Sequence, residues 1–325
     1  MKRIIIPFAV ISLSLVGCQS NNDNQNPNVL SQRYVHKYGY LVSKEEWEEK
    51  NYPGQVITTM QNGVTISSTY ENGILHGPMT YTFPHSQNVE NYYLYNWGEC
   101  VKEISYNVLG LPVQEKIQLS PTRYSITSWY LTGSPKSIEE YAGEELVDGQ
   151  YYNAKNDVEA RINKGKGMRI QRAANGTLLS KENFESGYAV KKETYYTSGT
   201  PESLSLYHRG QLTGEKKTFA PSGEPLSVEP WVNGQLHGVA RYYKNGTKYL
   251  EITYRNGEKN GIERHFIDGE IVSQEISWES DMKHGPSTFF HNGKPEEQQW
   301  FYGGKPVSKM KYDDLAEFDG LFMQR

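Results

Sequence analysis

The sequence predicts an all-β fold, in which antiparallel β-hairpins stack into one elongated, single-layer, twisted sheet. Three observations lead to this prediction. A unit of about 23 residues recurs eleven times, glycines stand at fixed places in the unit, and each unit opens with an aromatic residue or an isoleucine. A fixed period in this range is typical of stacked arrays, because one unit cannot bury its own apolar face.

The register of the units can be followed along most of the chain. The opening residues are Tyr70, Tyr95, Ile117, Tyr141, Ile162, Phe184, Tyr207, Trp231, Tyr254, Trp278 and Phe301. A first glycine follows three residues later at Gly73, Gly98, Gly165, Gly187, Gly210, Gly234, Gly257 and Gly304. In the clearest units a second glycine follows four residues after the first, and a third marks the middle of the unit. These three series together indicate one repeated structure.

Each unit has the composition of a β-hairpin. Short runs rich in Tyr, Phe, Val, Ile and Thr lie between the glycines, and Asn245-Gly246, Asp268-Gly269 and Asn292-Gly293 are signals for type I′ turns. In the run that leads to the opening residue Tyr254, Leu250 and Ile252 alternate with Tyr249 and Glu251, as in a strand with two different faces. We therefore expect about 22 strands, two for each unit.

The core of the unit is written most clearly as Trp231-Val-Asn-Gly-Gln-Leu-His-Gly238 and Tyr70-Glu-Asn-Gly-Ile-Leu-His-Gly77. This core resembles the MORN-type repeat, and most closely the bacterial variant found in YwqK-like antitoxin family proteins. The resemblance covers residues 56–312 and implies β-hairpins stacked into an elongated single-layer sheet. The family name also implies an alternative function, the inhibition of a toxin or effector.

The N-terminus carries signals for export and lipid attachment. Residues 1–17 combine the basic Lys2 and Arg3 with a short apolar stretch, which is typical of a signal peptide. The stretch ends in Leu15-Val16-Gly17-Cys18, which resembles a bacterial lipobox, so we expect diacylglycerol and a further acyl chain such as palmitate on Cys18. Several acyl chains give a stable membrane anchor. By resemblance to lipoproteins of two-membrane cells, Gln19 after the cysteine favours the outer membrane, facing the periplasm or the surface.

The regions flanking the repeats have their own predicted roles. Residues 18–33 are polar and low in complexity, so we expect a flexible tether. Residues 34–55 form an N-terminal cap, in which Ser43 and Glu46 resemble a capping box that opens a short helix ending near Lys50. Residues 313–325 form a C-terminal cap with a short helix from Asp313 to Phe318. Both caps would cover edges of the sheet.

Charge and cysteine content exclude some classes of function. Without Lys2 and Arg3 the chain has 32 basic and 38 acidic side chains, which does not fit a nucleic-acid-binding surface. The small basic run Lys164–Arg169 is interpreted as a solvated turn. After lipidation of Cys18 only Cys100 remains, so no intramolecular disulfide can form.

No motif for catalysis, a metal or a cofactor is found. His76, His237 and His284 share one place in the unit, but neighbouring units carry Thr213 and Asn260 there. Units two strands apart are separated by about 9.5 Å, whereas zinc ligands lie about 2 Å from the ion. These histidines are therefore interpreted as polar turn residues.

The function predicted from the sequence is that of a lipid-anchored, non-catalytic interaction or scaffold protein of the bacterial envelope. It would bind a protein partner along a repeated surface, because stacked arrays present such surfaces. Trp231 and Trp278 are candidate binding residues. The alternatives are an antitoxin-like inhibitor and a hydrolase of envelope material, and no constellation of residues favours the hydrolase.

Overall fold

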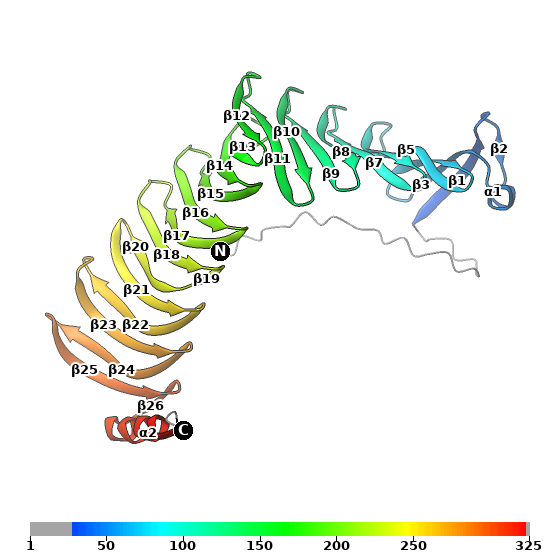
Figure 1. Ribbon diagram of the computed structural model, residues 1–325. Coiled ribbons are helices and arrows are strands. Elements are labelled where there is room, and N and C mark those ends of the chain that lie inside the picture. The colour runs from blue at the N-terminus through cyan, green and yellow to red at the C-terminus, as the bar shows by residue number, and fades with distance from the viewer. Residues whose placement is uncertain (1–27, 323–325) are drawn as a thin grey trace.

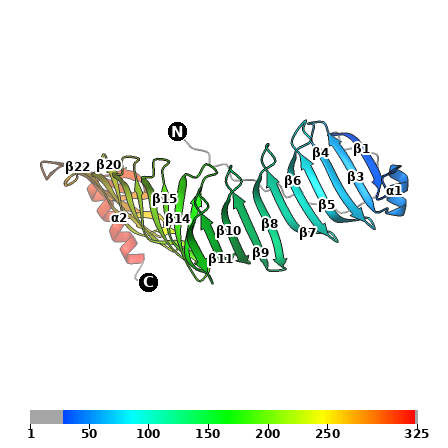
Figure 2. The same cartoon turned by 90° about the horizontal axis from the view of Figure 1, so that it is seen from above.

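The computed structural model describes residues 28–322, whose strands form one open antiparallel sheet with a helix near each end (Figure 1). With few exceptions each strand pairs with the strands before and after it in the chain. Seen from above, the strands from β1 to β11 lie side by side in a single layer (Figure 2). The prediction of an all-β array of stacked hairpins is confirmed.

The N-terminal elements are β1 (Val29–His36), β2 (Leu41–Val42), α1 (Lys44–Lys50), β3 (Gly54–Met60), β4 (Thr65–Glu71), β5 (Ile74–Thr82), β6 (Val89–Asn96), β7 (Glu99–Tyr106) and β8 (Pro112–Ser120). The middle elements are β9 (Arg123–Trp129), β10 (Pro135–Ala142), β11 (Glu145–Tyr152), β12 (Val158–Asn163), β13 (Lys166–Arg172), β14 (Leu178–Glu185), β15 (Tyr188–Tyr195), β16 (Pro201–His208) and β17 (Gln211–Phe219). The C-terminal elements are β18 (Pro225–Val232), β19 (Gln235–Leu236), β20 (Gly238–Lys244), β21 (Thr247–Arg255), β22 (Glu258–Ile267), β23 (Ile271–Glu279), β24 (Met282–His291), β25 (Lys294–Tyr302), β26 (Lys305–Val307) and α2 (Lys309–Phe322).

The structure has 26 strands, against the 22 or so expected from the repeats. The strands β1 to β4 precede the two strands of the first unit, because its opening residue Tyr70 lies near the end of β4. One strand is divided into β19 and β20 at His237, and α2 takes the place of the second strand in the last unit. Apart from this last unit, each unit is a hairpin.

The N-terminal cap contains the expected helix, but the sheet begins earlier than expected, within the predicted tether. The hydroxyl of Ser43 accepts a hydrogen bond from the Glu46 N–H at 3.1 Å and so begins α1. The strand β1 begins at Val29, so the end of the predicted 18–33 tether is part of the sheet. The reason is that β1 pairs along β3, from Val29 opposite Met60 to His36 opposite Gly54, which satisfies its backbone groups.

Two kinds of turn connect the strands. At most of the turns that follow the opening residues, two consecutive residues have positive φ, as at Asn233 and Gly234, which matches a type I′ turn. Many mid-unit turns instead have three-residue loops. In the turn at Gly110, for example, the Gly110 N–H donates to Asn107 O and the Asn107 N–H donates to Leu111 O. That pattern is a type I turn followed by a bulge. The mid-unit turns of the last three hairpins return to the expected Asn-Gly or Asp-Gly type I′ form.

The second glycine of each clear unit stands opposite the opening residue of the next unit. Gly77 pairs with Tyr95, Gly214 with Trp231, and Gly238 with Tyr254. Gly261 pairs with Trp278 and Gly285 with Phe301 in the same way. All five of these glycines have a positive φ, which glycine adopts without the steric cost of a side chain.

The two faces of the sheet differ in packing. We call the face that carries the opening residues the packed face, and the other the open face. On the packed face Ala240, Ile252 and Ile276 are buried in one cross-strand row. On the open face Leu206, Leu226 and Tyr249 are exposed. Successive residues of a strand point to opposite faces, so each strand contributes to both.

The array bends sharply near its middle, as Figure 1 shows between β10 and β14. At both edges of this elbow a turn contacts the turn two hairpins away: Leu131 N–H donates to Ala174 O, and Leu146 N–H donates to Gly187 O, each at 3.2 Å. Inside the bend Leu146, Tyr151, Ile162 and Phe184 form a compact core, which we call the elbow core. The elbow therefore buries more side chain than a flat single layer does.

The C-terminal helix α2 begins at Lys309, earlier than the expected Asp313, because the hydroxyl of Ser308 accepts from the Lys311 N–H at 3.2 Å and caps it. Tyr312 on α2 packs against the rings of Trp300, Tyr302 and His284. The helix thus covers the last hairpins, as expected for a cap.

Candidate functional site

The predicted lipidation site, Cys18, and the predicted signal peptide, residues 1–17, lie outside the described residues. Within residues 28–322 neither helix is long and apolar enough to cross a bilayer. The anchor at Cys18 therefore stays a prediction.

The two candidate binding residues, Trp231 and Trp278, lie at equivalent places near the ends of β18 and β23, on the packed face. Both rings are only partly exposed, and a lysine from the preceding hairpin lies over each one. Lys259 Nζ is 4.4 Å from the centre of the Trp278 ring, and Lys216 Nζ is 5.9 Å from that of Trp231. Both indole N–H groups are buried and have no hydrogen-bond partner among the described residues. A partner can therefore reach ring surface, but not the indole N–H groups.

The three histidines at one place in the unit connect that unit to the next. His76 Nδ1 accepts from the Trp97 N–H at 3.3 Å, and its ring lies 4.6 Å from the Trp97 ring. His284 Nδ1 accepts from the Gly303 N–H at 3.4 Å and packs on Tyr302 in the same way. Each histidine therefore holds the following turn. In the part of the chain that the structure describes, no three His, Cys, Asp or Glu side chains are placed to bind a metal ion.

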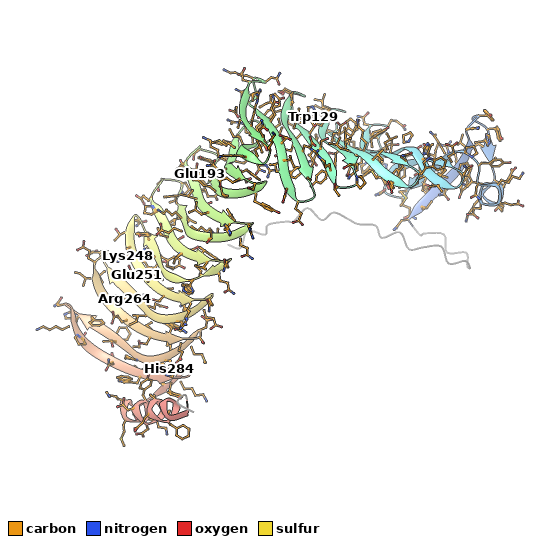
Figure 3. The ribbon with its side chains drawn as sticks, in the orientation of Figure 1. Trp129, Glu193, Lys248, Glu251, Arg264 and His284 are labelled. Carbon is orange, nitrogen blue, oxygen red and sulfur yellow. The ribbon has the colours of Figure 1, made fainter. Side chains whose placement is uncertain are left out.

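The open face carries an unbroken cross-strand row from β14 to β23. Its members are Lys181, Glu193, Leu204, Lys217, Val228, Arg241, Glu251, Arg264 and Glu275. We call this series the open-face row. Figure 3 shows Glu251 and Arg264 near each other on the C-terminal arm, with Glu193 nearer the elbow. Arg264 Nε lies 2.7 Å from Glu275 Oε1, and Lys248 Nζ lies 3.0 Å from Glu251 Oε1.

The elbow contains a cavity of about 310 Å³, which we call the elbow pocket. It lies on the packed face, between strands β8–β11 on one side and β13–β14 on the other. Polar side chains dominate its lining, including Ser128, Lys136, Ser137, Arg169, Gln171 and Arg172. The pocket exists because the sheet curls here, so that side chains from strands far apart in sequence converge.

A buried network of charges forms the wall of the elbow pocket. Glu139 is 6% exposed, and Arg169 contacts both of its oxygens, Nε to Oε1 at 2.7 Å and Nη2 to Oε2 at 3.1 Å. The hydroxyls of Tyr151 and Tyr141 donate to the same two oxygens at 2.9 and 2.8 Å. Every strong acceptor site on Glu139 is therefore used, so this carboxylate is not free to act as a general base.

The network extends to a second buried carboxylate. Glu182 is 4% exposed, and it contacts Arg169 Nη1 at 3.5 Å and Lys192 Nζ at 2.8 Å. Burial alone lowers the pKa of Arg169, but Glu139, Tyr141 and Glu182 raise it by more, so it stays charged. Burial raises the pKa of Tyr151, and the negative charge of Glu139 raises it further. Both tyrosines therefore act as neutral donors.

Arg169 is the site residue that the sequence placed wrongly. The run Lys164–Arg169 was predicted to be a solvated turn, and Lys164 and Lys166 are exposed as expected. Arg169 instead points into the elbow, because it lies two residues beyond Gly167 on the packed face of β13. The position of Arg169 in the repeat unit could have predicted that it lies on the packed face. It could not have predicted the carboxylate partners of Arg169, which come from strands β10 and β14.

Comparisons with known proteins add little. No protein-family model matches the chain, and no curated protein matches it. Among solved structures, chains in crystal structures described as TcdB2-TccC3-Cdc42 and as TcdB2-TccC3 without its hypervariable C-terminal region align with 84% of this chain. The identities are 12% and 10%, and the TM-scores are 0.19 and 0.18. This chain spans about a fifth of those chains, 21% and 19% of their lengths.

Proposed function

We propose that this protein is a non-catalytic scaffold of the bacterial envelope, anchored by lipid at Cys18, which binds a protein partner along its repeated sheet. The observation that carries the proposal is the open-face row, which presents nine side chains across eight consecutive strand pairings without enclosing a reaction site. Such arrays bind by extended contact with many weak and similar positions. The MORN-type resemblance over residues 56–312 supports the same reading.

The anchor is tested by labelling with palmitate in a bacterial host. We expect the label to be incorporated into the full chain and to be lost in Cys18→Ser, because thioether formation needs the thiol. Label retained by Cys18→Ser would rule out lipidation at this residue. The presence of residues 1–17 on the purified protein, measured by mass spectrometry, would rule out cleavage before Cys18.

The partner is tested by crosslinking in intact cells followed by mass spectrometry. We expect one protein to be captured reproducibly, with crosslinks spread over several hairpins. A small toxic protein captured in a one-to-one complex would favour the antitoxin-like alternative, to which only the family resemblance points. A turnover reaction abolished by one point substitution in the folded protein would overturn the non-catalytic proposal.

The tryptophans can then be tested against the captured partner. Both tryptophans lie on the packed face, so binding along the open-face row predicts unchanged affinity for folded Trp231→Ala and Trp278→Ala variants. Circular dichroism of each variant controls for folding, since both rings also pack on the sheet. A loss of about 1–3 kcal/mol of binding free energy in either folded variant would instead place the partner on the packed face and make that tryptophan a binding residue.

A further inference from the structure

The elbow pocket holds a positive charge that the protein does not neutralise. Lys136 lines the pocket, is partly buried, and makes no hydrogen bond or ion pair with another described residue. The nearest opposite charge that acts on it is that of Glu139. Because Arg169, Tyr141 and Tyr151 already occupy both oxygens of Glu139, that carboxylate has no strong acceptor site left for the ammonium.

The other charged side chains that line the elbow pocket are paired. Arg169 and Lys192 face Glu139 and Glu182, while Arg172 forms a two-point pair with Glu159 at 2.8 and 2.7 Å. Lys136 is therefore left over as one unpaired positive charge. Burial lowers the pKa of Lys136, which is the expected cost of keeping a cation partly out of water without a partner.

The rest of the lining can hold an anion as well as attract it. Ser128 and Ser137 stand opposite each other on β9 and β10 and bring hydroxyl donors to the pocket. Gln171 adds an amide, whose oxygen already accepts from Ser180 at 3.1 Å, so its nitrogen is the group left to donate. A cavity of about 310 Å³ is at the small end of ligand sites in proteins.

From these observations we propose that the elbow pocket is a binding site for a carboxylate, with Lys136 as its counter-charge and Ser128, Ser137 and Gln171 as hydrogen-bond donors. A single carboxylate matches the one unpaired charge and the size of the cavity. The group is carried either by a small free acid or by the end of a peptide chain. The site does not depend on the proposed scaffold role, since it concerns the packed face of the elbow rather than the open-face row.

The test uses the full chain purified in a non-ionic detergent. Acetate, N-acetylalanine and N-acetyl-dialanine are titrated against it by calorimetry, each beside its uncharged primary amide. We expect saturable binding of at least one acid and none of the amides. Tighter binding of N-acetyl-dialanine than of acetate assigns the site to a chain end, and equal binding assigns it to a small acid.

Variants then assign the binding to Lys136. Lys136→Met keeps the length of the side chain but removes its charge, and we expect it to weaken acid binding at least tenfold. Lys136→Arg should retain binding. Lys155→Met is the matched control, because Lys155 is an exposed lysine on the nearby β11–β12 turn, and it should bind as the natural chain does.

A stability measurement separates a ligand site from a structural lysine. If Lys136 serves a ligand, Lys136→Met should unfold at the same temperature as the natural chain or higher, because it removes an unpaired, partly buried charge. The proposal is overturned if no acid binds, if amides bind as well as acids, or if Lys136→Met binds acids as tightly as Lys155→Met. It is equally overturned if Lys136→Met both loses binding and unfolds at a markedly lower temperature.

Discussion

Gly261 on β22 lies directly opposite Trp278 on β23, and its backbone conformation explains why the second glycine of the unit recurs. Gly261 has a φ of +120°, and a Cβ added to it would lie 3.0 Å from the Cβ and Cγ2 atoms of Thr253. This φ favours glycine, and a side chain here would crowd Thr253 on the neighbouring strand β21. The same relation joins Gly285 to Phe301 and Gly238 to Tyr254.

We therefore predict that Gly261→Ala destabilises the array by about 1–3 kcal/mol, through a strained backbone and a displaced Thr253. The measurement is chemical denaturation followed by circular dichroism. The control is Gly234→Asn, at a turn where φ is +79° and nothing lies within 4 Å of an added Cβ. Asparagine adopts this conformation readily, so the control should cost much less. Equal losses in the two variants would show that the conformation of Gly261 and its closeness to Thr253 have no special role.

The elbow should be sensitive to the loss of its central arginine. Arg169→Met leaves the buried Glu139 and Glu182 without their shared partner, and breaking a buried pair costs about 3–5 kcal/mol. Arg264→Met is the control, because Arg264 and Glu275 are 40% and 31% exposed and such pairs contribute about 0–1 kcal/mol. Chemical denaturation of both variants measures the loss in the free energy of unfolding. A similar small loss in both would contradict the buried network.

Glu263 on β22 should make stability depend on pH. Burial tends to raise its pKa, but hydrogen bonds from Lys259 and His265, each at 2.8 Å, outweigh burial and hold the pKa below its usual value. A lowered folded-state pKa stabilises the protein above the unfolded pKa of about 4.5, and this stabilisation is lost as pH falls through the folded value. Glu263→Gln should thus be less stable than the natural chain at pH 6.

The difference between the two chains should shrink as the pH is lowered from 4.5 towards 3, because the protonated carboxyl no longer gains from Lys259. Denaturation curves at pH 6 and pH 3 measure it, and taking the difference removes the contribution of the other carboxylates. A difference that stays constant over this range would mean that the charge of Glu263 does not matter.

The C-terminal helix should protect the end of the sheet. Deleting residues 309–325 removes Tyr312 from the rings of Trp300 and Tyr302 and uncovers the last hairpins. Exposed strand edges pair with other chains, so we expect dimers or larger species by light scattering. The control is Tyr312→Phe, which keeps the ring and should have the same size by light scattering as the natural chain. A monodisperse deletion variant would show that α2 is not a cap.

The sequence predicted the hairpin unit because its signals are local. The aromatic openings, the turn glycines and the Ser43 cap each act within a few residues, and all are found where expected. The elbow could not be predicted, since it depends on contacts such as Leu146 with Gly187, which skip a whole hairpin. The burial of Arg169 follows from that curl, so its run of basic residues was misread.

The most direct test of the scaffold proposal is site-specific photo-crosslinking in cells. A crosslinking residue is placed in turn at Leu206, Leu226 and Tyr249, which are 37%, 40% and 42% exposed on the open face of three successive hairpins. Phe289, an exposed residue of the packed face, is the control. The proposal predicts that all three open-face positions capture the same protein and that Phe289 does not. Capture from none of the three, or from Phe289 alone, would contradict it.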